Sequence, residues 1–261
     1  MNFYKSVIEH HGKLLVRGIH NGQEFKEKID YSPTLYAISQ QDTEFKTLTG
    51  QSLKPIQFGS IKKARDFKRS YNTENAPIFG MDRYQYQYIA DNYSEDIQWS
   101  KDHIKIFTLD IECTAENGFP DIQNPVEELL AITVKNQSNK QIITWGTGEF
   151  KTNRSDVTYI KCRNEKSLIM EFMKFWIKNY PDVITGWNTK FFDLPYLCNR
   201  IKLLTDEKVV RRLSPWNLVG TEEITVRGRS QLYYDLYGIA MLDYLDLYKT
   251  FIPVRQESYK L

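Results

Sequence analysis

The stretch Ile104-Lys105-Ile106-Phe107-Thr108-Leu109-Asp110-Ile111-Glu112 decides the fold of this chain, because it has the pattern of a buried β-strand that carries two acidic residues. Side chains two positions apart in a strand share one face, so Asp110 and Glu112 are predicted to point the same way. An unpaired carboxylate is costly to bury, and a divalent cation is the usual compensation. The pair therefore predicts a metal site, although two solvated carboxylates at a frayed strand end would give the same pattern.

The composition describes an ordinary globular protein. The chain has 261 residues, of which 41% are hydrophobic and 26% charged, enough for one large domain or two smaller ones and unlike extended disorder. With 35 basic and 33 acidic residues the net charge is only +2, so total charge does not indicate a nucleic-acid partner.

The cysteines and the apolar runs exclude several classes of protein. Cys113, Cys162 and Cys198 are far apart and form no C-x-x-C pair, which argues against a structural zinc site or a disulfide framework. The N-terminus lacks the apolar stretch of a signal peptide, and no later segment approaches the roughly 18 apolar residues of a membrane span. We therefore expect a soluble, cytoplasmic protein without a membrane partner.

A polar stretch at residues 91–102 indicates a domain boundary near residue 100. Residues 1–100 mix short strand-like runs with a helical run over 61–70 that Ser60 can cap, which predicts a small α+β domain. Residues 101–261 alternate strands and helices, which predicts an α/β domain.

The runs that follow the Asp110 strand predict an antiparallel hairpin over Leu129–Val134 and Gln141–Trp145. An amphipathic helix is then expected after Asn164 and before Pro181. Its apolar stripe, predicted to pack in the core, consists of Ile169, Phe172, Met173 and Trp176.

A second acidic signal lies in Gly186-Trp187-Asn188-Thr189-Lys190-Phe191-Phe192-Asp193-Leu194-Pro195-Tyr196, which follows a strand-like run at 182–185. Asp193 is expected where a helix begins, and the helix dipole favours a carboxylate there. Two plainer interpretations stay open, in which Asp193 is an N-cap and Asn188 a turn residue.

Together these motifs resemble family B DNA polymerases of T-even-type bacteriophages. Asp110-Ile111-Glu112 resembles the first exonuclease motif of that family, and Gly186-Trp187-Asn188 with Phe192-Asp193-Leu194-Pro195-Tyr196 resembles the second. The stretch 242–249 and the regions 58–67 and 80–89 are also similar to the corresponding parts of these polymerases.

The resemblance implies an α/β fold, with a ribonuclease-H-like exonuclease domain of mixed sheet and flanking helices at 101–261 after an amino-terminal domain of polymerase type at 1–100. It implies that Asp110, Glu112 and Asp193 are catalytic and hold two Mg²⁺ or Mn²⁺ ions, with Asp110 bridging both. The implied reaction is 3′→5′ proofreading of single-stranded DNA or a frayed primer 3′ end during DNA replication, in the host cytoplasm if a phage encodes the chain.

Four further residues are predicted to contact the DNA: Asn188, Phe192, Arg227 and Arg229. The two arginines fall in residues 221–237, where alternation around Gly228 predicts a β-hairpin. Relatives use a hairpin in this region to help separate primer from template. A solvated edge hairpin is the alternative.

The chain departs from the family at its end. The third exonuclease motif, Y-x-x-x-D, lies beyond the equivalent of Lys249 and is not reached before Leu261. Asp243 and Asp246 are interpreted as helix-surface or capping groups rather than replacements. We expect the remaining polymerase part on a separate chain or in a missing region, and weak activity without it. The competing hypothesis is a catalytically weak nucleic-acid-binding or assembly subunit of a split polymerase.

Overall fold

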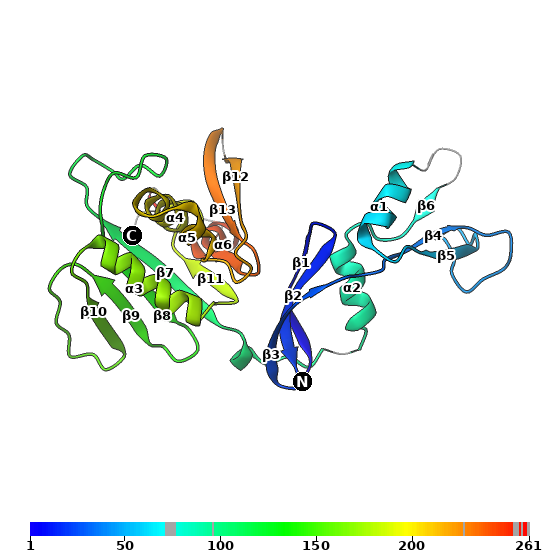
Figure 1. Ribbon diagram of the computed structural model, residues 1–261, viewed down its shortest axis with the longest axis horizontal. Helices are drawn as coiled ribbons and strands as arrows, with labels where there is room; N and C mark the ends of the chain where they lie inside the picture. Colours follow the sequence, from blue (N-terminus) through cyan, green and yellow to red (C-terminus); the bar gives the residue numbers. More distant parts are fainter. Residues whose placement is uncertain (71–76, 96, 227, 253–255, 257, 260–261) are drawn as a thin grey trace. The chain divides into compact units, whose positions relative to one another are not determined.

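A computed structural model describes residues 1–70, 77–95, 97–226, 228–252, 256 and 258–259 (Figure 1). The chain divides into two compact units, Met1–Trp99 and Ser100–Leu261, and each is described by itself. The assignment of the first unit to an amino-terminal domain of polymerase type stays a prediction.

The first unit contains two antiparallel sheets of three strands each, in the orders β1-β2-β3 and β5-β4-β6. Its core includes Leu14 on β2 and Leu35 on β4. Helix α1 begins after Ser60, whose hydroxyl accepts a hydrogen bond from the Lys63 amide at 3.2 Å, so the predicted cap is confirmed. The elements are β1 (Phe3–His10), β2 (Lys13–His20), β3 (Gln23–Ile29), β4 (Thr34–Ile38), β5 (Leu53–Gln57), α1 (Ile61–Ser70), β6 (Ile78–Phe79) and α2 (Tyr84–Asn92).

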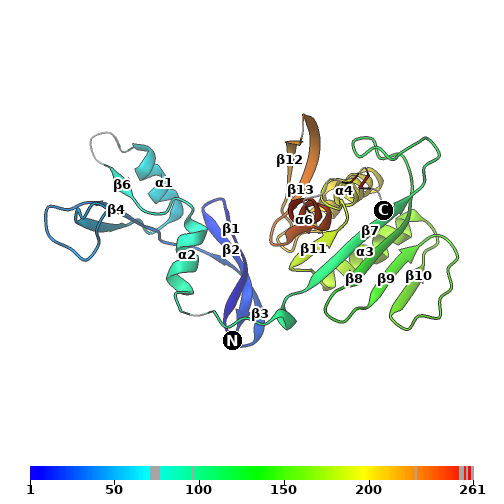
Figure 2. The ribbon, with the colours of Figure 1, turned by 180° about the vertical axis from the view of Figure 1, so that it is seen from behind.

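The second unit is built on a six-stranded mixed sheet in the order β10-β9-β8-β7-β11-β14 (Figure 2). Strands β7, β8 and β9 are antiparallel neighbours, whereas β11 runs parallel to both β7 and β14. The hairpin predicted after the Asp110 strand is therefore confirmed. The strands are β7 (Ile106–Cys113), β8 (Leu129–Asn136), β9 (Ile142–Gly146), β10 (Val157–Lys161), β11 (Val183–Gly186) and β14 (Ala240–Asp243).

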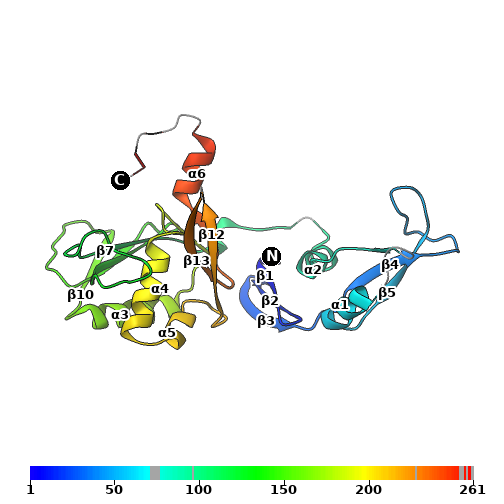
Figure 3. The same ribbon diagram turned by 90° about the horizontal axis from the view of Figure 1, so that it is seen from above.

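Helices flank this sheet. Helices α3, α4 and α5 lie on one side and α6 projects on the other (Figure 3). Asn164 caps α3 with a reciprocal pair of hydrogen bonds to Ser167, and the predicted apolar stripe of α3 is fully buried against the sheet. The helical elements are η1 (Lys101–His103), α3 (Glu165–Lys178), α4 (Asp193–Leu204), α5 (Glu207–Arg211) and α6 (Tyr244–Phe251).

The hairpin predicted within residues 221–237 is confirmed as strands β12 (Val219–Val226) and β13 (Arg229–Leu236), which pair antiparallel along their whole length. Arg227 lies outside the described residues. Within the part of the chain that the structure describes, no helix combines the length and apolar character needed to cross a bilayer.

Candidate active site

Strand β7 presents its two carboxylates on one face. Leu109 and Ile111 are buried in the core, while the intervening Asp110 and the following Glu112 are exposed. The strand alternation predicts this arrangement. Pairing with β8 shifts register between Glu112 and Cys113, so the regular ladder is interrupted directly after the second carboxylate.

The loop after β11 is held against β7 through a glycine. A Cβ atom on Gly186 would lie 2.0 Å from the hydroxyl of Thr189 and 2.6 Å from the carbonyl oxygen of Leu109, so this position requires glycine. The Thr189 hydroxyl donates to that same carbonyl at 3.2 Å. Asn188 turns the chain with a left-handed φ of 63°, and its carbonyl accepts from the amides of Phe191 and Phe192.

Asp193 is the first residue of α4, which begins after Phe192. The N-cap interpretation of Asp193 is wrong, because Phe192 occupies the cap and Asp193 bonds outside its own helix. The Asp193 carboxylate accepts a hydrogen bond from the Ile111 amide of β7 at 3.1 Å, and the residue is only 4% exposed. Since Ile111 stands between Asp110 and Glu112, this bond brings the buried carboxylate to the acidic part of β7.

The pKa values show that like charges meet here. Burial, and next the charge of Asp110, raises the pKa of Asp193 from the ordinary 3.8 to about 7. Loss of water around its carboxyl group, followed by the charge of Glu112, also raises the pKa of Asp110. Repulsion between carboxylates therefore runs from Glu112 through Asp110 to Asp193, and a bound cation would relieve it.

Asp243 is a structural carboxylate beside this cluster. It is buried and caps α6, since Oδ1 accepts from the amides of Leu245 at 2.8 Å and Asn188 at 3.2 Å. Its Oδ2 accepts from the Lys190 amide at 2.8 Å. The capping interpretation is confirmed. Asp246 lies one turn further and is exposed, 3.5 Å from the Lys190 ammonium.

The residues predicted to contact DNA differ in their burial and in their neighbours. Phe192 is half-buried, with its ring centroid 5.9 Å from that of Tyr196 and 5.2 Å from that of Phe119. Phe119 is 83% exposed and was missed by the sequence analysis, although an aromatic residue between Gly118 and Pro120 in a loop is a usable signal. The structure describes the Arg229 backbone at the start of β13 but not its side chain.

A family model described as DNA polymerase family B, exonuclease domain, matches residues 44–261. The chain belongs to this family. It is 29% identical to the DNA-directed DNA polymerases of Enterobacteria phage T4 and of Escherichia phage RB69, over 99% of this chain and 32% of each relative. It is 31% identical to the DNA polymerase delta catalytic subunit of Candida albicans, over 39% of this chain and 10% of that protein. The chain spans about a third of the length of the phage polymerases that it matches.

Family B exonuclease domains generally use divalent metal ions, and the donor set here is compatible with that use. Carboxylate oxygens suit Mg²⁺ or Mn²⁺. Within the described residues, however, no three His, Cys, Asp or Glu side chains gather closely enough to hold an ion. Asp193 is fixed by Ile111, whereas no hydrogen bond or ion pair holds the carboxylate of Asp110 or Glu112 in the described part of the chain. The three carboxylates therefore differ in restraint, one fixed by a main-chain hydrogen bond and two exposed without one among the described residues.

Replacing Asp243 by alanine in this exonuclease domain is expected to lower the free energy of unfolding by about 2 kcal/mol, because the amides of Asn188, Lys190 and Leu245 lose their acceptor. Urea unfolding followed by circular dichroism measures the change. Asp246→Ala is the matched control, since its exposed carboxylate contributes little. Equal stability of the two variants would contradict the capping role of Asp243.

Proposed function

We propose that the second unit is a ribonuclease-H-like 3′→5′ exonuclease that removes nucleotides from single-stranded DNA or a frayed primer 3′ end during DNA replication. One observation carries the proposal. The buried carboxylate of Asp193, on a helix, reaches the backbone between Asp110 and Glu112, on a strand that is distant in sequence. The carboxylate of α4 therefore lies next to the strand that carries the other two carboxylates.

In this proposal Asp110, Glu112 and Asp193 are the catalytic residues and would hold two Mg²⁺ or Mn²⁺ ions. When bound, such ions would supply the charge that activates water and stabilises the leaving 3′ oxygen. The chain itself supplies Asp193, whose carboxylate is buried and therefore shielded from bulk water. It also supplies Asp110 and Glu112, whose exposed side chains can adjust to the ions. The ribonuclease-H-like assignment is supported by a mixed sheet in which β7, β8 and β9, consecutive in the chain, are antiparallel neighbours.

The DNA is proposed to lie beside the start of α4, where Phe192 and the exposed Phe119 offer rings for base stacking. Asn188 stands in the turn before α4 and is proposed as a further DNA contact. Arg227, which lies outside the described residues, and Arg229, at the start of β13, remain proposed DNA contacts. The proposed partner is the rest of a polymerase, with the first unit as its amino-terminal domain.

A second function is favoured by a specific observation. The described residues gather no three metal ligands in ion-holding positions, which fits a catalytically weak subunit that binds nucleic acid or assembles with a polymerase. The two functions differ in what happens to bound DNA.

The full chain is expected to shorten 5′-labelled single-stranded DNA stepwise from its 3′ end when Mg²⁺ or Mn²⁺ is present, and to stop when EDTA is added. Denaturing gel electrophoresis resolves the single-nucleotide steps. A phosphorothioate at the 3′-terminal linkage, which hinders cleavage of that bond, is the matched control substrate. Retention of the labelled strand by the protein without any shortening would contradict the exonuclease and support the binding subunit.

A further inference from the structure

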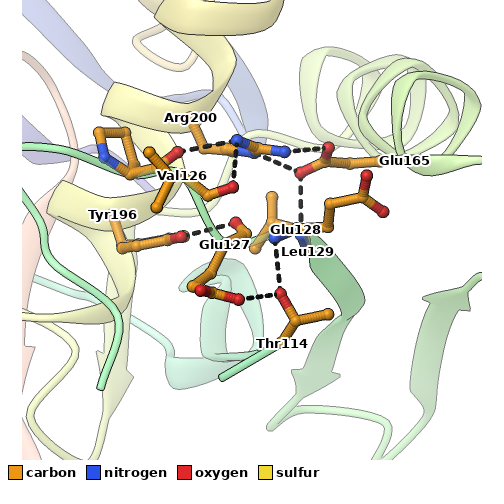
Figure 4. A network of polar contacts seen from close by, with 9 residues as sticks. Thr114, Val126, Glu127, Glu128, Leu129, Glu165, Tyr196 and Arg200 are labelled. Atoms are coloured by element: carbon orange, nitrogen blue, oxygen red, sulfur yellow. Dashed lines mark hydrogen bonds and ion pairs between the residues drawn. The ribbon is translucent and has the colours of Figure 1, made fainter. Parts of the chain in front are cut away.

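One face of α4 is bonded to the segment that follows the acidic strand. Asp193, Tyr196 and Arg200 are spaced by three and four residues, so they lie on the same side of the helix. The Tyr196 hydroxyl donates to the main-chain carbonyl of Glu127 at 2.6 Å, and Arg200 Nη1 donates to the carbonyl of Val126 at 3.1 Å (Figure 4). The connection between β7 and β8 is thus attached to the helix that carries Asp193.

Glu127 extends this attachment to the end of β7. Its carboxylate accepts hydrogen bonds from the hydroxyl of Thr114 and, at 2.9 Å, from both the amide and the side chain of Asn117. The Thr114 hydroxyl, and next the Asn117 amide, lowers the pKa of Glu127 to about 2. Thr114 comes two residues after Glu112, and its hydroxyl accepts from the Glu128 amide at 2.9 Å. Glu127 therefore fixes the backbone immediately beyond the second carboxylate of the strand.

A buried ion pair completes the attachment on the other side. Arg200 bonds Glu165 of α3 through two parallel contacts of 2.6 Å, Nε to Oε1 and Nη2 to Oε2, and both residues are buried. Glu165 Oε1 also accepts from the amide of Leu129, the first residue of β8, at 2.8 Å. Buried pairs add little net stability compared with apolar residues of the same size. The Arg200–Glu165 pair is bidentate and also bonds the main chain of Val126 and Leu129, so it is suited to fixing the position of that segment.

We propose that Tyr196, Glu127 and the Arg200–Glu165 pair are positioning residues, which hold the Glu112 end of β7 at a set place relative to Asp193 so that both can hold the same ions. The route runs from Asp193 along α4 to Tyr196, across to Glu127 and through Thr114 to Glu112. It opposes the repulsion that would separate the carboxylates. The inference rests on the proposed ion site. Groups behind metal ligands commonly set metal affinity in this way.

The test measures Mn²⁺ binding to the full chain by electron paramagnetic resonance of the free ion. Tyr196→Phe removes only the hydroxyl that bonds Glu127 and is expected to weaken Mn²⁺ binding about tenfold. The matched control is Tyr180→Phe, which removes a hydroxyl that also donates to a main-chain carbonyl, that of Arg212 after α5, outside the β7–β8 connection. The control should bind Mn²⁺ as the unaltered chain does.

A second variant checks the carboxylate. Glu127→Gln replaces one acceptor oxygen by an NH₂ group, which cannot accept the hydrogen bonds that Thr114 and the Glu116 amide donate to the carboxylate. This variant should also weaken Mn²⁺ binding about tenfold. In cleavage assays both altered chains should recover most of their rate at saturating Mn²⁺, which general loosening of the fold would not allow. Unchanged affinity in Tyr196→Phe and Glu127→Gln, or equal weakening in Tyr180→Phe, overturns the positioning role alone. If the unaltered chain binds Mn²⁺ no better than Asp110→Asn does, the ion site itself is rejected, and the positioning role with it.

Discussion

The Asp110→Asn variant is expected to cleave single-stranded DNA roughly 10³-fold more slowly than the unaltered chain, with its folding preserved. The substitution keeps the size of an exposed side chain and removes the charge that lies between Glu112 and Asp193. Removing one group that stabilises the transition state electrostatically commonly costs about 10²- to 10³-fold, and Asp110 is proposed to serve two ions. Initial rates of 3′ shortening with saturating Mn²⁺ measure the effect.

Asp246→Asn is the matched control for that experiment. It removes an exposed carboxylate near the same loop, 3.5 Å from the Lys190 ammonium, and an exposed ion pair of this kind contributes about 1 kcal/mol or less. The rate should stay within about twofold, because Asp246 is not directed at Asp193. Equal loss in the two variants would show that Asp110 matters no more than a nearby exposed carboxylate, which would contradict its proposed place between two ions.

The parts of the fold that could be predicted from the sequence are those set by short-range periodicity. The alternation in β7 predicts which residues face the core and that Asp110 and Glu112 share the other face. The stripe of α3 and the Asn164 cap are equally local, because both follow from residues within a few turns of one helix. The β12–β13 hairpin depends on two adjacent runs and the residues between them.

The rest of the site depends on contacts between residues far apart in the chain. Asp193 bonds β7 because Ile111 lies beside it in the fold, although the two residues are 82 positions apart in the sequence. A local sequence pattern cannot predict a contact between residues so far apart. The Glu165–Arg200 pair joins two helices, so each residue alone resembles an ordinary exposed charge in the sequence. Asp243 likewise bonds the loop after β11, which periodicity does not bring near it.

In the absence of divalent ions, the Asp193→Asn variant is expected to be more stable than the unaltered chain at pH 8, by about 4 kcal/mol. The ordinary pKa of an aspartate is 3.8 and that of Asp193 in the fold is about 7, a difference worth about 4 kcal/mol. Between these values the folded chain binds a proton that the unfolded chain does not. The free energy of unfolding therefore falls as pH rises from about 4 to about 7, and stays low above that.

Asparagine keeps the acceptor for the Ile111 amide but carries no charge, so the advantage of the variant should shrink toward zero as pH falls to about 4. Urea unfolding in EDTA at several pH values measures this dependence. An advantage that is the same at every pH would show that the substitution acts through packing and not through a raised pKa. Adding Mn²⁺ at pH 8 should then stabilise the unaltered chain and not the variant, because the ion neutralises the repulsion that the asparagine has already removed. The same carboxylate that costs stability in the empty protein is thus the one expected to provide affinity for the ion.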